Sequence, residues 1–408
     1  MFRRLLDRAT RAFFRPWAFF SKEFVQLRRQ PRLILMLVLG PFAILLLFGL
    51  GYNSQPQPIN TILVLPTDLN LPTDVASYKS EFIQPFNLVG VTTDRAAAVD
   101  QLDHQKVDAV VLFPSGAQQT ILGGQRATIE VLFNVLDPLQ RSWLNYYSYV
   151  QTNELNRQVL QRALQQQDGQ SAQSGLLAAA VLSGGRTIPP SVLVSPFQVQ
   201  GKNLAPTSPG YVVYFSPGVL ALLVQHIAVT FTALALVRER TRGAIEVFRV
   251  APVSSREILF GKFISYFLQT LVLAVVLAVL MKLALGVPFL GPYDVLLGAI
   301  ALVILASLGL GFLISAVSNS ETQAVQLSLL VLIASVFFSG FLVPLANLIK
   351  AVRVVSYLLP VTYGIQALQR VMLRGQDPPL FDIAGLAGIA IVATVIAAIA
   401  FQRAFQRR

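Results

Sequence analysis

The sequence predicts a membrane protein of six transmembrane helices, with an α/β domain inserted between the first and second helices and an amphipathic helix before the first. Three observations predict this fold class. Only 13% of the 408 residues are charged, about half of the roughly 25% that is usual in soluble domains. Six long apolar runs contain no Asp, Glu, Lys or Arg, whereas residues 52–211 have ordinary soluble composition. An ordinary soluble enzyme is therefore excluded.

The leader, residues 1–32, predicts an amphipathic helix that lies in the headgroup layer of the membrane. Its apolar residues recur at helical intervals and form one stripe, with basic residues off the stripe. The stripe consists of Trp17, Phe20, Phe24 and Leu27. Packing of the stripe against a partner subunit is the alternative. Pro31 would end this helix before the first span.

The apolar runs are long enough to cross a bilayer. The first transmembrane segment is expected at residues 33–51, where an uncharged run of 18 residues would form a helix about 27 Å long. A signal peptide is a poor explanation, because the leader and the apolar core are both too long. Residues 212–401 are expected to hold transmembrane helices two to six. Their apolar runs are 212–237, 263–281, 295–317, 324–343 and 383–401.

The distribution of basic residues predicts the orientation. Residues 1–32 hold nine Lys or Arg against two acidic residues, the 238–262 loop holds six against three, and the tail, residues 402–408, adds three Arg. The short 318–323 loop on the same side holds one Glu, so these four parts together carry the net charge of +12. The positive-inside rule assigns this face to the cytoplasm. We expect a multi-pass cell-membrane protein that contacts lipids, has both termini in the cytoplasm and has no nucleic-acid partner.

Residues 52–211 predict a small extracytoplasmic α/β domain of four or so strands. Short β-branched runs alternate with segments of helical periodicity. The predicted strands are 61–65, 87–91, 107–113 and 128–136. From Pro138 to about residue 182 the pattern is helical, with a polar break near 165–169 where the helix could stop. Five prolines between residues 189 and 209 then indicate an extended segment that leads to the second span.

The long helix of this domain carries an aromatic face. Its residues are Trp143, Tyr146, Tyr147 and Val150. We expect this face to pack against the sheet of its own domain, because large aromatic side chains are usually buried at least in part. Contact with an apolar cargo that leaves the membrane is the alternative.

The chain lacks the residues of common catalytic and cofactor sites. It has no cysteine and only two histidines, so disulfides and Cys- or His-rich metal centres are excluded. It also contains no G-x-x-x-x-G-K-[ST] phosphate loop, no H-E-x-x-H and no G-x-S-x-G. We therefore expect this chain to have no catalytic residue, no metal and no cofactor.

The loop at residues 238–262 has the features of a docking segment. Gly243 would interrupt the preceding helix, and Pro252 would end a short amphipathic segment. So short a helix is marginal in water, and a groove on a partner would stabilise it. A solvated basic loop that only sets topology is the alternative. The candidate docking residues are Arg240, Gly243, Ile245, Glu246, Phe248, Arg249 and Pro252.

Few polar side chains lie within the apolar runs. Either they line a path for a substrate, or they bond to neighbouring helices and to their own backbone. Ion-coupled transporters usually need an ionisable group at depth, and here His226 alone could supply one. A path without fixed charge suits an apolar or amphipathic molecule. The candidate path residues are Gln225, His226, Gln269, Gln326 and Ser339.

Two blocks of residues resemble the conserved segments of a known protein family. The first contains Arg238-Glu239-Arg240, Gly243-Ala244-Ile245-Glu246, Pro252 and Gly261-Lys262, and the second contains Phe338-Ser339-Gly340-Phe341-Leu342-Val343-Pro344, Leu359-Pro360-Val361-Thr362-Tyr363-Gly364 and Met372-Leu373-Arg374-Gly375. In this order and together with six spans, the blocks resemble the ABC-2 family of ABC-transporter permeases over nearly the whole chain. Ala244 stands where the family usually has Thr.

The resemblance implies export driven by ATP hydrolysis in separate subunits. Because the candidate path carries no fixed charge, we expect the exported molecule to be a lipid or drug-like compound that passes between the second and fifth spans. It implies a dimer with an identical or sister permease, and two separate ATP-binding-cassette subunits that bind the ATP and Mg. The 238–262 loop would couple to these subunits, and residues 344–373 would form re-entrant helices on the outer side. The alternatives are an ion-coupled secondary transporter and a membrane-anchored assembly protein whose outer domain binds a partner.

Overall fold

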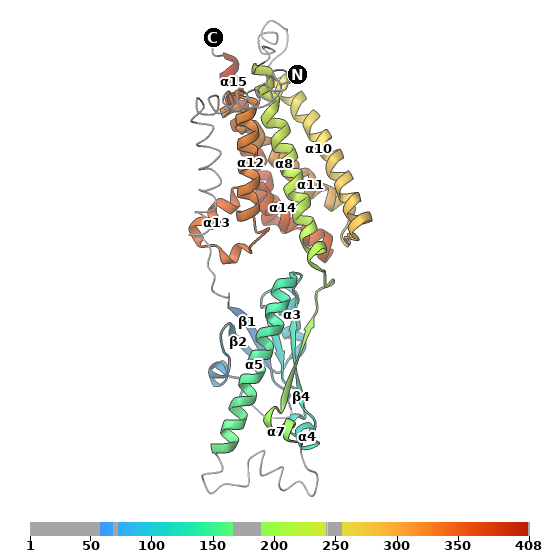
Figure 1. Cartoon of the computed structure of the whole chain (residues 1–408), viewed down its shortest axis with the longest axis vertical. Coiled ribbons are helices and arrows are strands. Elements are labelled where there is room, and N and C mark those ends of the chain that lie inside the picture. The colour runs from blue at the N-terminus through green and yellow to red at the C-terminus, as the bar shows by residue number, and fades with distance from the viewer. Residues whose placement is uncertain (1–57, 68–71, 166–188, 242, 244–254, 407–408) are drawn as a thin grey trace, which may run out of the picture. The chain divides into compact units, whose positions relative to one another are not determined.

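The structure is a computed structural model that describes residues 58–67, 72–165, 189–241, 243 and 255–406 (Figure 1). The chain divides into two compact units: residues 55–214 form one, and the other contains residues 215–408. We call them the sheet unit and the helical unit. The predicted leader helix and first span lie outside the described residues.

The sheet unit contains a five-stranded sheet in the order β2-β1-β3-β4-β5. β1 pairs in parallel with β2 and β3, β3 pairs antiparallel with β4, and β4 pairs in parallel with β5. The strands are β1 (Ile59–Val64), β2 (Phe86–Thr92), β3 (Ala109–Leu112), β4 (Ala127–Phe133) and β5 (Phe197–Asn203). The first four coincide with predicted strands.

Helices cover both faces of this sheet. Because side chains alternate along a strand, Ile129 and Val131 of β4 face one core and Leu132 faces the other. α3 (Arg95–Asp103) packs on the Leu132 side, and Asp94 caps it by accepting hydrogen bonds from the N–H groups of Ala96 and Ala97. The other side is covered by α4 (Ala117–Leu122), α5 (Pro138–Gln165) and α7 (Pro190–Val194).

Two expectations for the sheet unit need correction. The segment predicted as merely extended contains the short helix α7 and a fifth strand, β5. No proline lies between Pro196 and Pro206, so the backbone N–H groups of this stretch are available to pair with β4. Only part of the aromatic face of α5 packs on the sheet. Tyr147 joins the core, but Trp143 and Tyr146 are each 57% exposed, because the turn of the helix directs them away from the buried face of Leu144 and Ser148.

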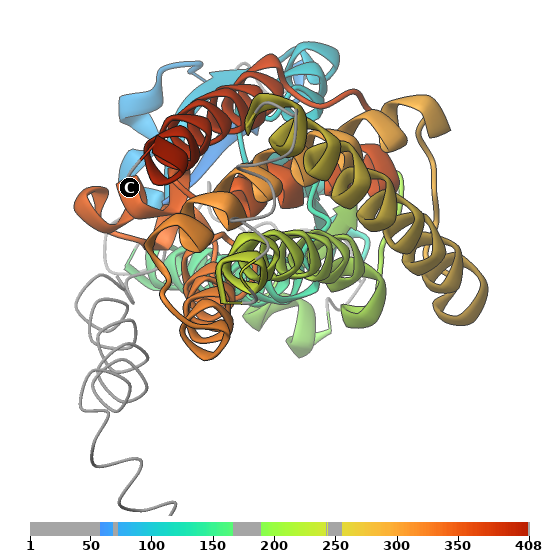
Figure 2. The same cartoon turned by 90° about the horizontal axis from the view of Figure 1, so that it is seen from above.

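The described part of the helical unit contains five helices long and apolar enough to cross a membrane. They are α8 (Tyr211–Thr241), α10 (Ser255–Leu285), α11 (Tyr293–Val317), α12 (Glu321–Phe338) and α15 (Leu380–Gln406). α8 and α11 are the most buried, whereas α10, α12 and α15 expose most of their apolar length. Figure 2 shows these helices from above, with α10 and α15 crossing the view obliquely. α12 stops five residues before the predicted end of its run, at residue 343, because Gly340 takes a positive φ of 87°.

Between α12 and α15 the chain forms short helices rather than a straight span. α13 (Lys350–Tyr357) and the helix that begins at Pro360 meet at an angle of 83°. The second of these comprises α14 (Pro360–Gln369) and a π-helical turn, Arg370–Arg374. This geometry fits a re-entrant segment. Its placement on the outer side of the membrane stays a prediction.

Small residues let the helices approach closely. A Cβ at Gly311 would lie 2.6 Å from the carbonyl oxygen of Val229 in α8, and one at Gly309 would lie 2.8 Å from Cβ of Ala393 in α15. Gly385 similarly lies against the ring of Tyr363. Gly388 differs, since no described atom lies within 4 Å of its Cβ position. Gly309, Gly311 and Gly385 therefore lie at close helix contacts, and Gly388 does not.

The contrast between Gly311 and Gly388 gives a test of the α8–α11 packing. We expect Gly311→Ala to destabilise the protein by about 1–3 kcal/mol, because the added methyl group overpacks the contact. The matched variant Gly388→Ala should be neutral or stabilising by up to about 1 kcal/mol, because alanine is the better helix former. Thermal unfolding in detergent, followed by size-exclusion chromatography, would measure both. Equal melting temperatures for the two variants would contradict this packing.

Candidate functional site

Gln225 lies at the meeting point of three helices in the helical unit. It is on α8 and is 1% exposed. Its Nε2 donates to Oγ of Ser335 in α12 at 2.7 Å, and its Oε1 accepts from the backbone N–H of Val361 in α14 at 2.9 Å. The side chain therefore supplies a partner to the first turn of α14, where the preceding residue, Pro360, has no N–H group. In this structure the Gln225 side chain connects α8 to α12 and α14.

The other candidate path residues are dispersed along the helices. His226 on α8 and Gln326 on α12 are partly exposed, and Gln269 on α10 is exposed and donates to Oγ of Ser265 one turn away. Ser339 is buried at the end of α12, where its Oγ accepts from the N–H of Phe341. Within the described residues, Nδ1 of His226 has no hydrogen-bond partner.

The end of α8 is attached to three other helices by three consecutive residues. Arg238 forms an ion pair with Glu321 of α12, with Nε and Oε2 3.0 Å apart. Glu239 forms an ion pair with Lys262 of α10. Arg240 donates to the carbonyl oxygens of Ser318 and Ser315, at 3.3 and 3.4 Å. We call Arg238, Glu239 and Arg240 the charged triplet.

The three attachments differ in exposure and strength. The side chains of Glu239 and Lys262 are each 18% exposed, whereas those of Arg238 and Glu321 are 49% and 40% exposed. Water and salt screen an exposed pair, so it contributes little, but breaking a shielded pair leaves a poorly solvated charge. Arg240 lies at the C-terminal end of α11, where a cation is favoured by the helix dipole and by carbonyl groups that lack helical partners. The Glu239–Lys262 pair is therefore the most consequential of the three.

The short amphipathic segment predicted between Gly243 and Pro252 comes just after this charged triplet. α8 ends at Thr241, and Gly243 has a φ of 73°, as expected of a glycine that terminates a helix. The predicted contacts Ile245, Glu246, Phe248, Arg249 and Pro252 lie outside the described residues. The structure thus describes Arg240 and Gly243 among the candidate docking residues.

The sequence did not lead us to predict the ion-pair partners of the charged triplet. Glu239 and Lys262 are 23 residues apart, on opposite sides of the loop. Opposite charges at the two ends of a loop between antiparallel spans are a signal that could have found this pair. Nothing comparable marks Glu321 as the partner of Arg238, because several acidic residues are available to it. Among the described residues, no group of three His, Asp or Glu side chains could hold a metal.

Comparisons with known proteins found a matching family model and several relatives. A family model described as "ABC-2 family transporter protein" matches residues 31–399. The chain is 24% identical over 363 residues to "Probable multidrug ABC transporter permease YbhS" of Escherichia coli K12, which covers 88% of each chain.

Two further relatives match part of the chain. "Inner membrane transport permease YhhJ" of Escherichia coli K12 is 30% identical over 161 residues, 39% of this chain and 43% of that protein. "ABC transporter G family member 20" of Dictyostelium discoideum is 32% identical over 181 residues, 43% of this chain and 24% of that protein. With a family match over nearly its whole length and five described helices that could cross a membrane, this chain is a multi-pass membrane protein and belongs to the ABC-2 family of transporter proteins.

Proposed function

We propose that this chain is the permease subunit of an ATP-binding-cassette exporter that moves an apolar or amphipathic molecule, such as a lipid or a drug, out of the cytoplasm or the inner leaflet. Membership of the ABC-2 family supports the permease role. The name of the relative YbhS, a probable multidrug ABC transporter permease, favours this class of substrate. In the proposed complex, two ATP-binding-cassette subunits bind ATP and Mg, and a second permease, identical or a sister subunit, completes a dimer.

The single observation that carries this proposal is the charged triplet. Its residues lie at the start of the 238–262 loop, just before the segment from Gly243 to Pro252 that we propose to dock on the ATPase. A displacement of that loop reaches α12 through Arg238, α10 through Glu239 and α11 through Arg240. One docking event would therefore move four helices together. In the proposed cycle, ATP-driven closure of the partner subunits displaces the loop, and the helices respond by opening the dimer interface.

The substrate path is proposed to run between α8 and α12, the second and fifth spans, at the interface of the two permeases. His226 and Gln326 are partly exposed on these helices and would meet the substrate first. Gln225 and Ser339 are buried within one chain, so they would contact the substrate only when α8 and α12 separate. Gln269 lies on the exposed side of α10 and would face the partner or lipid.

The proposed topology places the sheet unit outside the cytoplasm of the cell and both termini inside it. In this topology the cytoplasmic leader is residues 1–32, the first span 33–51, the extracytoplasmic domain 52–211, the remaining helices 212–401, and the tail 402–408. The concentration of positive charge in the leader, the 238–262 loop and the tail supports it.

Glu246 gives the direct test of coupling to an ATPase. We expect the permease to co-purify with an ATP-binding-cassette subunit, and Glu246→Ala to lower substrate-stimulated ATP hydrolysis at least several-fold, because the variant loses a polar anchor of the docking segment. Asp100→Ala, on the exposed side of α3, is the matched control and should leave hydrolysis unchanged. Full stimulation by Glu246→Ala would disprove the role of Glu246. A chain that recruits no ATPase, or whose transport stops with an uncoupler but not on loss of ATP, would contradict the whole proposal.

The Glu239–Lys262 pair gives a second test. Lys262→Met should leave assembly with the ATPase intact but reduce stimulated hydrolysis several-fold, because Glu239 keeps its charge in a shielded place without its partner. The exchange Glu239→Lys with Lys262→Glu should recover most of the activity. Lys282→Met is the control, because Lys282 lies at the other end of α10 and donates to the hydroxyl of Tyr293. If the exchange is no better than Lys262→Met alone, the pair does not transmit the movement.

A further inference from the structure

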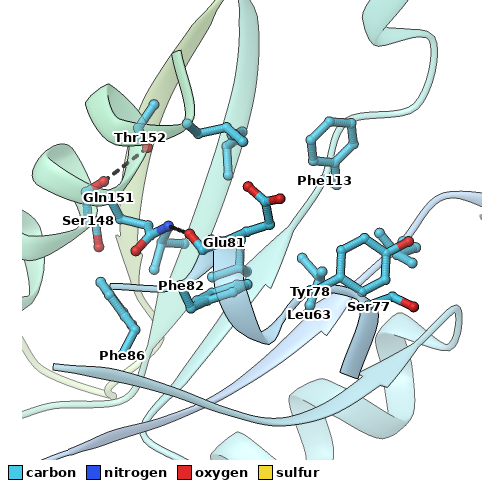
Figure 3. A pocket seen from close by; sticks show the side chains of 15 residues that line it. Leu63, Ser77, Tyr78, Glu81, Phe82, Phe86, Phe113, Ser148, Gln151 and Thr152 are labelled. Carbon is cyan, nitrogen blue, oxygen red and sulfur yellow. Dashed lines mark hydrogen bonds between the residues drawn. The ribbon is translucent and has the colours of Figure 1, made fainter. Parts of the chain in front are cut away.

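The sheet unit contains a cavity of about 280 Å³ between the sheet and α5 (Figure 3). Its walls are largely apolar side chains from β1, β3 and β4, such as Leu63, Val111 and Ile129. A short segment before β2 forms one side of the rim. A volume of this size is near the lower end of the range for small-molecule sites. The cavity could therefore hold a molecule of one or two rings.

Four aromatic side chains contribute to the lining: Tyr78, Phe82, Phe86 and Phe113. The rings of Phe82 and Phe86 meet edge to face, with centroids 6.4 Å apart. Aromatic rings present a negative π-face, so a site lined by several of them favours an organic cation over an anion. Phe113 also packs on Phe197 of β5, which holds that wall of the cavity in place.

Glu81 adds a carboxylate to this aromatic lining. Figure 3 shows its side chain directed into the space that the cavity residues surround. A carboxylate has about four acceptor sites, so Glu81 can receive an ammonium group in addition to bonds within the domain. Among the described residues that line the cavity, none is Lys or Arg. A cation that entered would therefore meet the Glu81 carboxylate on a described lining that is otherwise uncharged.

The polar side chains of α5 that line the cavity already form hydrogen bonds within the domain. Gln151 accepts from the N–H of Ile83 and donates to the carbonyl oxygen of Glu81, so it fastens the rim segment to the helix. Ser148 and Thr152 donate to carbonyl oxygens of their own helix. Tyr78 differs, because its hydroxyl is buried and has no hydrogen-bond partner among the described residues. Burial also raises the pKa of Tyr78, so the phenol is neutral and can donate or accept.

We propose that this cavity binds a small aromatic or aliphatic amine in its cationic form, with the ammonium group at Glu81, the apolar part among the aromatic rings, and the Tyr78 hydroxyl as a second polar contact. The binding is a property of the sheet unit and does not rest on the proposed transport. An uncharged apolar molecule would lose the contact with Glu81, and a carboxylic acid would be repelled by it.

Equilibrium dialysis of the full-length chain in lipid nanodiscs, without ATPase or nucleotide, would test this site. The probes are 1-naphthylmethylamine, its neutral analogue 1-naphthalenemethanol and the anion 1-naphthoate, and empty nanodiscs correct for partition into lipid. We expect saturable binding of the amine, at least about tenfold tighter than the alcohol, since a hydrogen bond to a charged group is worth at least this factor. Naphthoate should not bind above the empty-disc background.

Variants assign the binding to the cavity. Glu81→Gln should weaken the amine about tenfold and leave the alcohol unchanged, whereas Asp100→Asn, which removes a charge from the exposed surface of α3, should leave both unchanged. Ser77→Trp, at an exposed position of the rim, should block both probes. Tyr78→Phe provides a second variant that removes one oxygen atom and should weaken the amine. Amine binding that is absent, unsaturable, equal to that of the alcohol, or unaffected by both Glu81→Gln and Tyr78→Phe would overturn the proposal.

Discussion

A helix that begins inside a bundle of membrane helices must find partners for its first N–H groups, because lipid offers none. α14 meets this requirement with a side chain from a distant part of the chain. The Gln225 amide accepts from Val361 and donates to Ser335, so α8, α12 and α14 converge on one group. α14 can therefore be buried along nearly its whole length. The close contact of Gly364 with Val303 of α11 and that of Tyr363 with Gly385 of α15 depend on this placement.

The two units satisfy the same backbone requirement in different ways. In the sheet unit, strands supply partners to one another, and the alternation of side chains produces two cores beneath two sets of helices. In the helical unit the backbone N–H and C=O groups of each long helix bond to one another within that helix. Polar side chains are needed as backbone partners only where a helix begins or ends. Ser320 and Gln323 show this at the start of α12, where Ser320 accepts from the N–H of Gln323 and the Gln323 side chain accepts from Asn319.

Periodicity and hydropathy were sufficient to predict most elements, because each depends on neighbours in sequence. The first four strands and the later spans belong to this class. β5 was missed because its partner, β4, lies about 70 residues away and the local signal was dominated by proline. The exposure of Trp143 depends on which face of α5 the sheet selects. The partners of Gln225 are 110 and 136 residues away, so no local pattern could distinguish a connection between helices from a path lining.

The charged triplet also determines how the end of α8 can move. A helix held at one point can pivot about that point, and a helix held at two points can swing about the line between them. α8 is held toward α12, α10 and α11 by three consecutive residues, whose side chains leave the helix about 100° apart. The three contacts point in three directions, and the shielded Glu239–Lys262 pair is the strongest of them. A displacement of this end of α8 therefore has to be shared with α10, α11 and α12, or it has to break at least one of these contacts.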